Sequence, residues 1–214
     1  MNRLPKLALL FAALVSTSAH ADRGLDHAIG RIQHEWDIVN YKTPEDKRDS
    51  AFETLAEMAR DVSQRYPNHA EPLVWQAIVL ASEAKVKGGF RALGLAKDAR
   101  NLLLSAEKID PAALDGSIYT TLGSLYYKVP GWPIGFGDRK KARAYLEKAM
   151  KLNPSGIDAN YFYGDLMLEE GNYDAAIGYL KKALAAPARP GREVADAGRR
   201  MEIQSDLKKA EESR

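Results

Sequence analysis

The sequence predicts an all-α protein built from antiparallel helix pairs that repeat along the chain. Almost every segment after residue 21 has apolar residues at helical spacing, and alternating β-branched runs are scarce. A second observation is a set of small and apolar residues that recurs at fixed offsets. The 214 residues are 45% hydrophobic and 28% charged, which is an ordinary globular composition. We therefore predict a single helical domain over residues 22–214.

The first 21 residues have the pattern of a secretory signal peptide. Met1–Lys6 has two basic residues and no acid, Leu7–Val15 is an unbroken apolar run, and Ala19 and Ala21 form an A-x-A exit. As a helix the apolar run would rise only about 14 Å, about half of the hydrocarbon core of a bilayer, which disfavours the alternative of an uncleaved anchor. We expect cleavage after Ala21, a periplasmic location and no stable membrane insertion.

Charge and cysteine content narrow the classes of function. The chain has 31 basic and 29 acidic residues, and loss of Arg3 and Lys6 with the signal peptide leaves 29 of each. A net charge near zero gives no long-range attraction to nucleic acid or anionic lipid, so no nucleic-acid partner is expected. Because the sequence has no cysteine, it can form neither a disulfide nor a lipidated cysteine after the signal.

Three predicted helices carry the same small-residue motif. Alanine, leucine and alanine fall at offsets 0, 4 and 7, and a proline follows at offset 12, or at offset 11 in the third helix. Small residues let a neighbouring helix approach closely, and proline cannot continue a helix, so it ends the unit. The three sets are Ala99, Leu103, Ala106 and Pro111; Ala142, Leu146, Ala149 and Pro154; and Ala176, Leu180, Ala183 and Pro187.

The helices before these three repeat as well, with a small residue followed three positions later by a large one. The motifs are Trp75-Gln76-Ala77-x-x-Leu80, Leu122-Gly123-x-x-Tyr126 and Tyr163-Gly164-x-x-Met167. Together the two sets of offsets resemble the tetratricopeptide repeat. The resemblance implies a right-handed solenoid of antiparallel helix pairs, with units at about 70–111, 115–154 and 157–187. Residues 22–67 are expected to form a degenerate first pair, and about 192–212 a charged capping helix.

Two insertions between repeat helices are the main candidates for a binding site. Lys128–Asp138 carries Trp132, Ile134 and Phe136 among two prolines and three glycines, and Asp138 is expected to cap the next helix. Two interpretations stay open, because the aromatic side chains could fill a gap between helices or the loop could wall a ligand groove or partner surface. The other insertion, residues 87–95, carries Phe90 and Leu93. If both emerge at the same end, they would assemble an apolar pocket.

Two tyrosines are further candidates. By resemblance to tetratricopeptide arrays, Tyr127 and Tyr161 face the concave groove, where tyrosine offers apolar area and a hydroxyl. The clamp for a peptide carboxylate known in chaperone-binding members has no match here, because Thr120, Ser124 and Lys128 take that face.

Catalytic and metal-binding constellations are weak. His27 and His34 are seven residues apart, about two helical turns, which is too far to chelate one metal directly. The glycines of the loop lack the lysine and serine of a phosphate-binding motif. We therefore predict no enzymatic activity and no cofactor.

The region from Leu73 to Arg200 resembles exported tetratricopeptide proteins of Gram-negative bacteria. Its helix layout and aromatic loop are similar to the T-component (TatT) of tripartite ATP-independent periplasmic (TRAP) transporters, although lipidated members have a cysteine that this chain lacks. The resemblance implies association with a substrate-binding protein and an apolar ligand. The expected function is a periplasmic scaffold for another protein or peptide. The alternative is an accessory or carrier protein of a transport system that holds a small apolar ligand.

Overall fold

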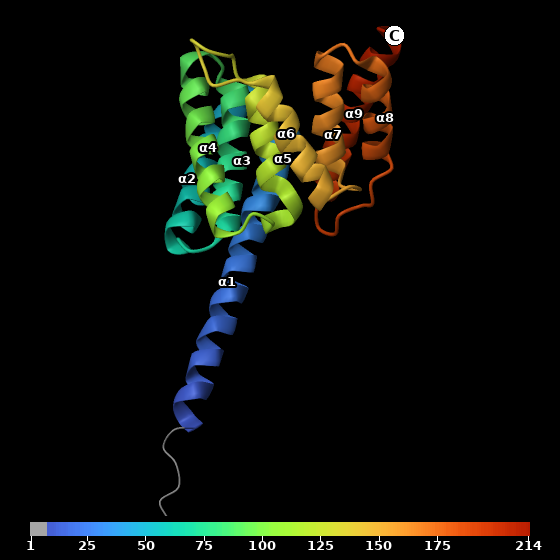
Figure 1. Ribbon diagram of the computed structural model, residues 1–214. Coiled ribbons are helices and arrows are strands. Elements are labelled where there is room, and N and C mark those ends of the chain that lie inside the picture. The colour runs from blue at the N-terminus through green and yellow to red at the C-terminus, as the bar shows by residue number, and fades with distance from the viewer. Residues whose placement is uncertain (1–7) are drawn as a thin grey trace, which may run out of the picture.

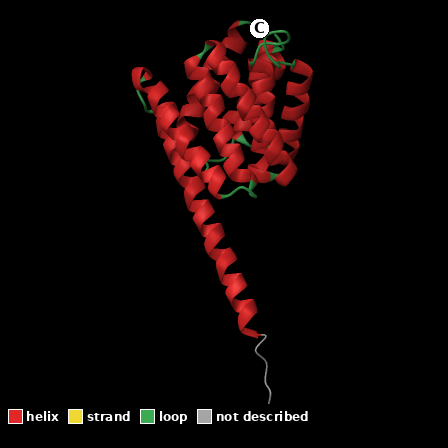
Figure 2. Cartoon of the chain, turned by 90° about the vertical axis from the view of Figure 1, so that its left-hand side faces the viewer, coloured by secondary structure: helices red, strands yellow, loops and turns green. Residues whose placement is uncertain are grey.

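The computed structural model describes the backbone of residues 8–214 and the side chains from residue 23 onward. The predicted signal peptide, residues 1–21, lies outside the residues whose side chains are described, and its cleavage stays a prediction. Nine helices form the described chain and short loops connect them (Figures 1 and 2). They are α1 (Ala8–Tyr41), α2 (Glu45–Arg65), α3 (Ala70–Lys87), α4 (Gly89–Ile109), α5 (Ala113–Lys128), α6 (Arg139–Leu152), α7 (Ile157–Glu169), α8 (Tyr173–Leu184) and α9 (Glu193–Glu212).

The first eight helices form four antiparallel pairs that stack in two layers. The odd-numbered helices α1, α3, α5 and α7 contact one another in sequence and make the inner layer, while the even-numbered helices pack on their outer side. The last helix, α9, contacts α7 and α8 and also reaches α1 at the other end of the array. The N-terminal part of α1 projects away from this body (Figure 1). Among the described helices, none is both long and apolar enough to cross a membrane.

The small-residue motif lies where the helices of each pair cross. Its alanines and leucines in α4, α6 and α8 are all fully buried. A Cβ atom added to Gly123 of α5 would lie 2.5 Å from Leu146 Cγ, and one added to Gly164 of α7 would lie 2.9 Å from Leu180 Cγ. Both distances are shorter than real Cβ contacts, so any larger residue would force the leucine side chain at the crossing to shift. The predicted all-α solenoid of antiparallel helix pairs is confirmed.

The ends of the helices position the two insertions. Gly88 ends α3 and has a φ of 64°, a left-handed conformation that favours glycine and lets the chain reverse into α4. The Asp138 side chain accepts a hydrogen bond of 3.0 Å from the Lys141 backbone N–H, as expected of a residue that caps α6. The Lys128–Asp138 loop and the α3–α4 turn therefore emerge at the same end of the array (Figure 1).

Candidate binding cleft

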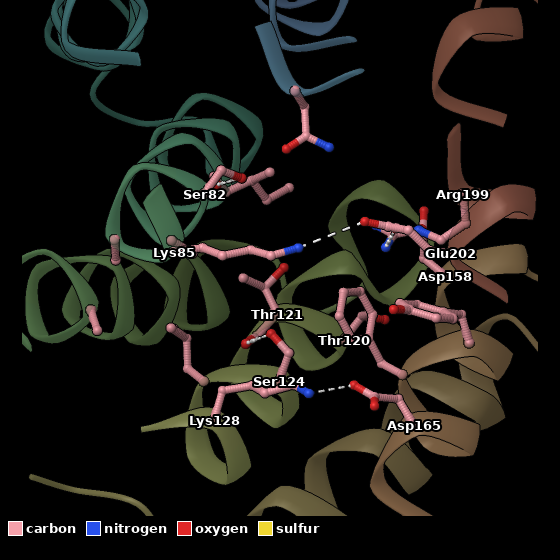
Figure 3. Close-up of a pocket in the computed structure, with 18 of the residues that line it drawn as sticks. Ser82, Lys85, Thr120, Thr121, Ser124, Lys128, Asp158, Asp165, Arg199 and Glu202 are labelled. Atoms are coloured by element: carbon pink, nitrogen blue, oxygen red, sulfur yellow. Dashed lines mark hydrogen bonds and ion pairs between the residues drawn. The ribbon is translucent and has the colours of Figure 1, made fainter. Parts of the chain in front are cut away.

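The inner layer and α9 enclose a cleft of about 1200 Å³. One wall consists of residues from α1, α3, α5 and α7, and the opposite wall is formed by α9 and the linker before it. Residues of α4 and of the Lys128–Asp138 loop also line the cleft. Figure 3 shows how side chains from these walls converge, with Lys85 of α3 reaching across toward Glu202 of α9. The cleft is therefore bounded on two sides, unlike the concave face of an open solenoid.

A stripe of hydroxyl groups runs along the α5 wall, where helical spacing puts them on one face. The hydroxyl groups of Ser117, Thr120 and Ser124 donate to backbone carbonyls of their own helix at 2.7, 3.2 and 2.9 Å. Each hydroxyl proton is therefore already used, while its oxygen retains the capacity to accept. This wall of the cleft suits a ligand that brings N–H or O–H donors.

A fixed cation stands where α5 approaches α7. Lys128 Nζ lies 2.7 Å from Asp165 Oδ2 and 2.7 Å from Glu169 Oε1. Burial lowers the pKa of Lys128, but these two carboxylates outweigh it, so the pKa is raised and the ammonium stays charged. The Tyr127 hydroxyl donates to the same Asp165 oxygen at 2.7 Å, and burial raises the pKa of this phenol well above its usual range. Lys128 and Tyr127 thus both contact the same Asp165 oxygen, and only 9% of the Asp165 side chain is exposed.

Paired charges rigidify the end of the cleft near α9. Arg199 Nε contacts Asp158 Oδ1 at 2.8 Å, and its guanidinium lies 4.5 Å from the centre of the Tyr161 ring. Arg189 contacts both Asp158 and Asp196 at 2.7 Å. Burial raises the pKa of Asp158, but Arg199 and Arg189 outweigh it and the pKa is lowered. Because each arginine is matched by carboxylates, this end of the cleft is organised without a large net charge.

The linker and α9 are clamped to α1. Arg192 donates to both carboxylate oxygens of Asp37, at 3.0 Å from Nε and 2.7 Å from Nη2, and only 4% of the Asp37 side chain is exposed. Its guanidinium also lies 5.2 Å from the centre of the Trp75 ring. Gly198 packs directly on the Tyr41 ring, so closely that a Cβ atom there would lie 2.2 Å from Tyr41 Cδ1. These contacts define the α1–α9 clamp, formed by Asp37, Tyr41, Arg192 and Gly198, which closes the cleft.

The structure separates the seven candidate residues into two groups. The residues that line the cleft are Phe90, Leu93, Ile134 and Tyr161, and those that do not are Tyr127, Trp132 and Phe136. The two insertions do meet, because a Cβ atom added to Gly135 would lie 3.2 Å from Leu93 Cδ1. Phe136 fills the gap beside α5, with its ring 5.4 Å from that of Tyr126, whereas 90% of Trp132 is exposed. Phe136 thus packs between helices, as one interpretation of the loop expects, while a binding role for Trp132 stays a prediction.

Sequence reasoning missed the residues of the α1–α9 clamp. Asp37 and Arg192 have no motif around them, and these two partners are 155 positions apart. The local signal available was a tryptophan and an aspartate side by side on an otherwise amphipathic helix, which alone points to no partner.

Comparisons with known proteins place the fold. Residues 134–197 match the family model of the tetratricopeptide repeat. The solved structure of a thermophilic TPR protein from Thermus thermophilus is similar over 76% of this chain and 90% of that chain, with 18% identity and a TM-score of 0.54. MamA is similar over 81% of this chain and 95% of that chain, with 23% identity and a TM-score of 0.45. No curated protein sequence matches the chain.

The fold is therefore that of a tetratricopeptide repeat protein, and the family match covers the stretch from the Trp132 loop through α8 to the start of α9. Arrays of this kind bury a continuous core between neighbouring units and present an extended concave surface. Such surfaces bind other proteins, which supports a protein–protein interaction scaffold as the class of this chain.

Proposed function

We propose that this chain is an exported scaffold that binds a segment of another protein in the cleft between the inner helices and α9. The observation that carries the proposal is the size and shape of the cleft, about 1200 Å³ with walls on two sides. Pockets for small ligands are typically about 300–1,000 Å³, so a site of this size suits several residues of a polypeptide.

The chemistry of the walls supports a peptide ligand. The hydroxyl stripe of α5 offers acceptors for backbone N–H groups of a bound segment. Lys85 is largely exposed and its only ion pair among the described residues is with Glu202 at 3.7 Å, so an acidic group of the partner can replace that long contact. Exposed ion pairs of this length contribute about 0–1 kcal/mol to stability, so little free energy is lost when a partner's acidic group replaces Glu202.

A periplasmic location is part of the proposal and is supported by the signal-peptide pattern of residues 1–21. N-terminal sequencing of protein recovered from the periplasm should begin at Asp22. Recovery of the chain only in the cytoplasm, with Met1 intact, would contradict this part.

Site-specific photo-crosslinking tests the cleft. A photoreactive residue at Thr121, on the cleft wall, should capture a partner protein from periplasmic extract. The matched control is Gly178, on the outer helix α8, where an added Cβ has nothing within 4 Å. Capture at Thr121 and not at Gly178 supports the proposal. Equal capture at both positions, or none at Thr121 from a folded protein, would overturn it.

The alternative is an accessory protein of a TatT-like periplasmic transport system that holds a small apolar ligand. The observation that favours it is the apolar lining at one end of the cleft, where Phe90, Leu93 and Ile134 come together. Native mass spectrometry of the exported protein is the test. A bound small molecule that is lost in Leu93→Glu would favour this alternative, whereas a ligand-free protein that still captures a partner at Thr121 would exclude it.

A further inference from the structure

Three exposed apolar side chains gather at one end of the molecule. Phe90, Trp132 and Ile134 are 92%, 90% and 64% exposed, and they are three of the six large apolar side chains that are exposed in the described part of the chain. They lie on the two insertions, which touch through Leu93 and Gly135. In Figure 1 the Trp132 loop rises beyond the helix ends at this edge of the array. We call Phe90, Trp132 and Ile134 the apolar tip.

The Trp132 loop is held in shape by its own hydrogen bonds. The backbone N–H groups of Ile134 and Gly135 both donate to the Gly131 carbonyl, at 3.2 and 3.1 Å, and Gly137 N–H donates to the Pro130 carbonyl at 2.9 Å. Phe136 anchors the loop from below through the Tyr126 ring and the Arg100 guanidinium, which lies 4.4 Å from the centre of the Phe136 ring. The loop is therefore fixed in a conformation that exposes Trp132. Little conformational entropy of the loop is lost when the Trp132 side chain leaves water.

The two segments that carry the apolar tip are rich in basic residues. Residues 87–100 and 128–141 together contain eight basic and two acidic residues, in a chain that is otherwise nearly balanced. Acidic side chains of α2, α3 and α7 neutralise part of this excess, since Lys87 pairs with Asp49, Glu53 and Glu83, and Lys128 with Asp165 and Glu169.

Several cations in these segments remain available. Lys97 and Lys140 pair with no carboxylate among the described residues, and Arg91 is mostly exposed with Glu53 at 3.6 Å. Of the two acidic residues in these segments, Asp138 is committed to capping α6, while Asp98 is exposed. A local positive excess of this kind attracts anionic headgroups within about one Debye length, even when the whole protein is neutral.

We propose that the apolar tip and its flanking cations adsorb reversibly to the surface of a bilayer that contains anionic phospholipid. Tryptophan is enriched at membrane interfaces, where its ring lies at the level of the headgroups. A bilayer accepts protruding side chains anywhere on its surface, whereas a protein partner needs a recess of matching shape for each of them. The three side chains protrude, which favours the bilayer. Because few side chains insert, the binding is weak and reversible. Phe90 and Ile134 also line the cleft, whereas Trp132 does not, so Trp132 is the position that separates vesicle binding from binding in the cleft.

Trp132 itself reports on the interaction. Trp36 and Trp75 are only 8% and 5% exposed, so Trp132 is the tryptophan whose emission should respond to lipid. Exported protein is mixed with vesicles of phosphatidylethanolamine and phosphatidylglycerol, and in parallel with vesicles of phosphatidylcholine. We expect a blue shift and co-sedimentation with the anionic vesicles, and quenching by lipids brominated on their acyl chains. Added salt should weaken the binding, because salt screens the headgroup attraction.

Matched variants make the test specific. Trp132→Ser should reduce the vesicle partition coefficient by about tenfold, because the largest apolar side chain of the tip no longer leaves water and Trp132 does not line the cleft. Met201→Ser removes an exposed apolar side chain from α9 and serves as the control. Lys140→Glu should weaken binding to anionic vesicles more than Lys108→Glu, which changes an exposed lysine in the last turn of α4.

If residues 1–21 are still attached, their contribution to vesicle binding is the same in every variant, so it cancels when variants are compared. A folded wild-type protein that does not bind anionic vesicles would overturn the proposal. So would a tip variant that binds vesicles as well as wild type, or one that loses capture of a partner protein while its vesicle binding is unchanged. A failure of Thr121 to capture a partner would leave the vesicle results unaffected, so the two proposals fail separately.

Discussion

Arg192→Met should lower the free energy of unfolding by about 3–5 kcal/mol, because it strands a carboxylate that water barely reaches. The Asp37 side chain is 4% exposed and both of its oxygens accept from Arg192. Methionine keeps most of the apolar contact with the Trp75 ring but removes the charge and both donors. The loss therefore measures the buried ion pair and not the packing of the side chain.

A double-mutant cycle with Asp37→Asn isolates the pair. The double variant should be less destabilised than the sum of the single variants, with a coupling energy of about 1–3 kcal/mol. Urea denaturation at pH 7, followed by circular dichroism, supplies the four free energies. Lys85→Met is the matched control, since this exposed cation has only a 3.7 Å contact to Glu202 and should cost less than about 1 kcal/mol. If Arg192→Met and Lys85→Met cost the same and the coupling energy is zero, the α1–α9 clamp does not stabilise the fold.

Three further predictions concern packing and charge. Gly164→Leu should lower the free energy of unfolding by about 1–3 kcal/mol, because its Cβ would lie 2.9 Å from Leu180 Cγ. The loss should exceed that of Gly171→Ala in the α7–α8 turn. A denaturation midpoint equal to that of wild type would refute the close crossing. Glu83→Gln should raise the melting temperature at pH 7, since burial is the main cause of the raised pKa of Glu83 and disfavours its charged form; an unchanged or lower value would contradict this. The pKa of Asp158 is lowered, so its ion pairs stabilise the fold above its unfolded pKa of about 3.9 and the effect is lost as pH falls through the folded value. Asp158→Asn should therefore be destabilising at pH 7 and flatten the acid limb of a stability profile.

The repeat architecture could be predicted from sequence because its signal is local. Ala142, Leu146 and Ala149 occupy one face of one helix, and the same offsets recur in α4 and α8, so the pattern can be identified without a structure. Gly123 and Gly164 likewise mark the crossings within a unit, since a Cβ atom there would lie under 3.0 Å from the leucine of the partner helix. These features depend on neighbours within about forty positions, which a repeat places at constant spacing.

The candidate site was predicted only in part. Apolar residues of the insertions could be identified by type, but their exposure could not, and Phe136 turns inward while Trp132, earlier in the same loop, remains in solvent. The cleft itself depends on where α9 lies, and that is fixed by contacts such as Arg192 to Asp37 across 155 positions. A pair that distant leaves no periodic trace in one sequence.

The contact between α9 and α1 changes how stability should be distributed along the array. In an open tandem array each unit feels only its immediate neighbours, so the terminal units fray first and folding can spread from any point. Here α9 and the residue before it contact α1, so the two ends of the array are neighbours in space. Damage to either terminus should then be felt at the opposite one, and hydrogen exchange should show both terminal units opening together.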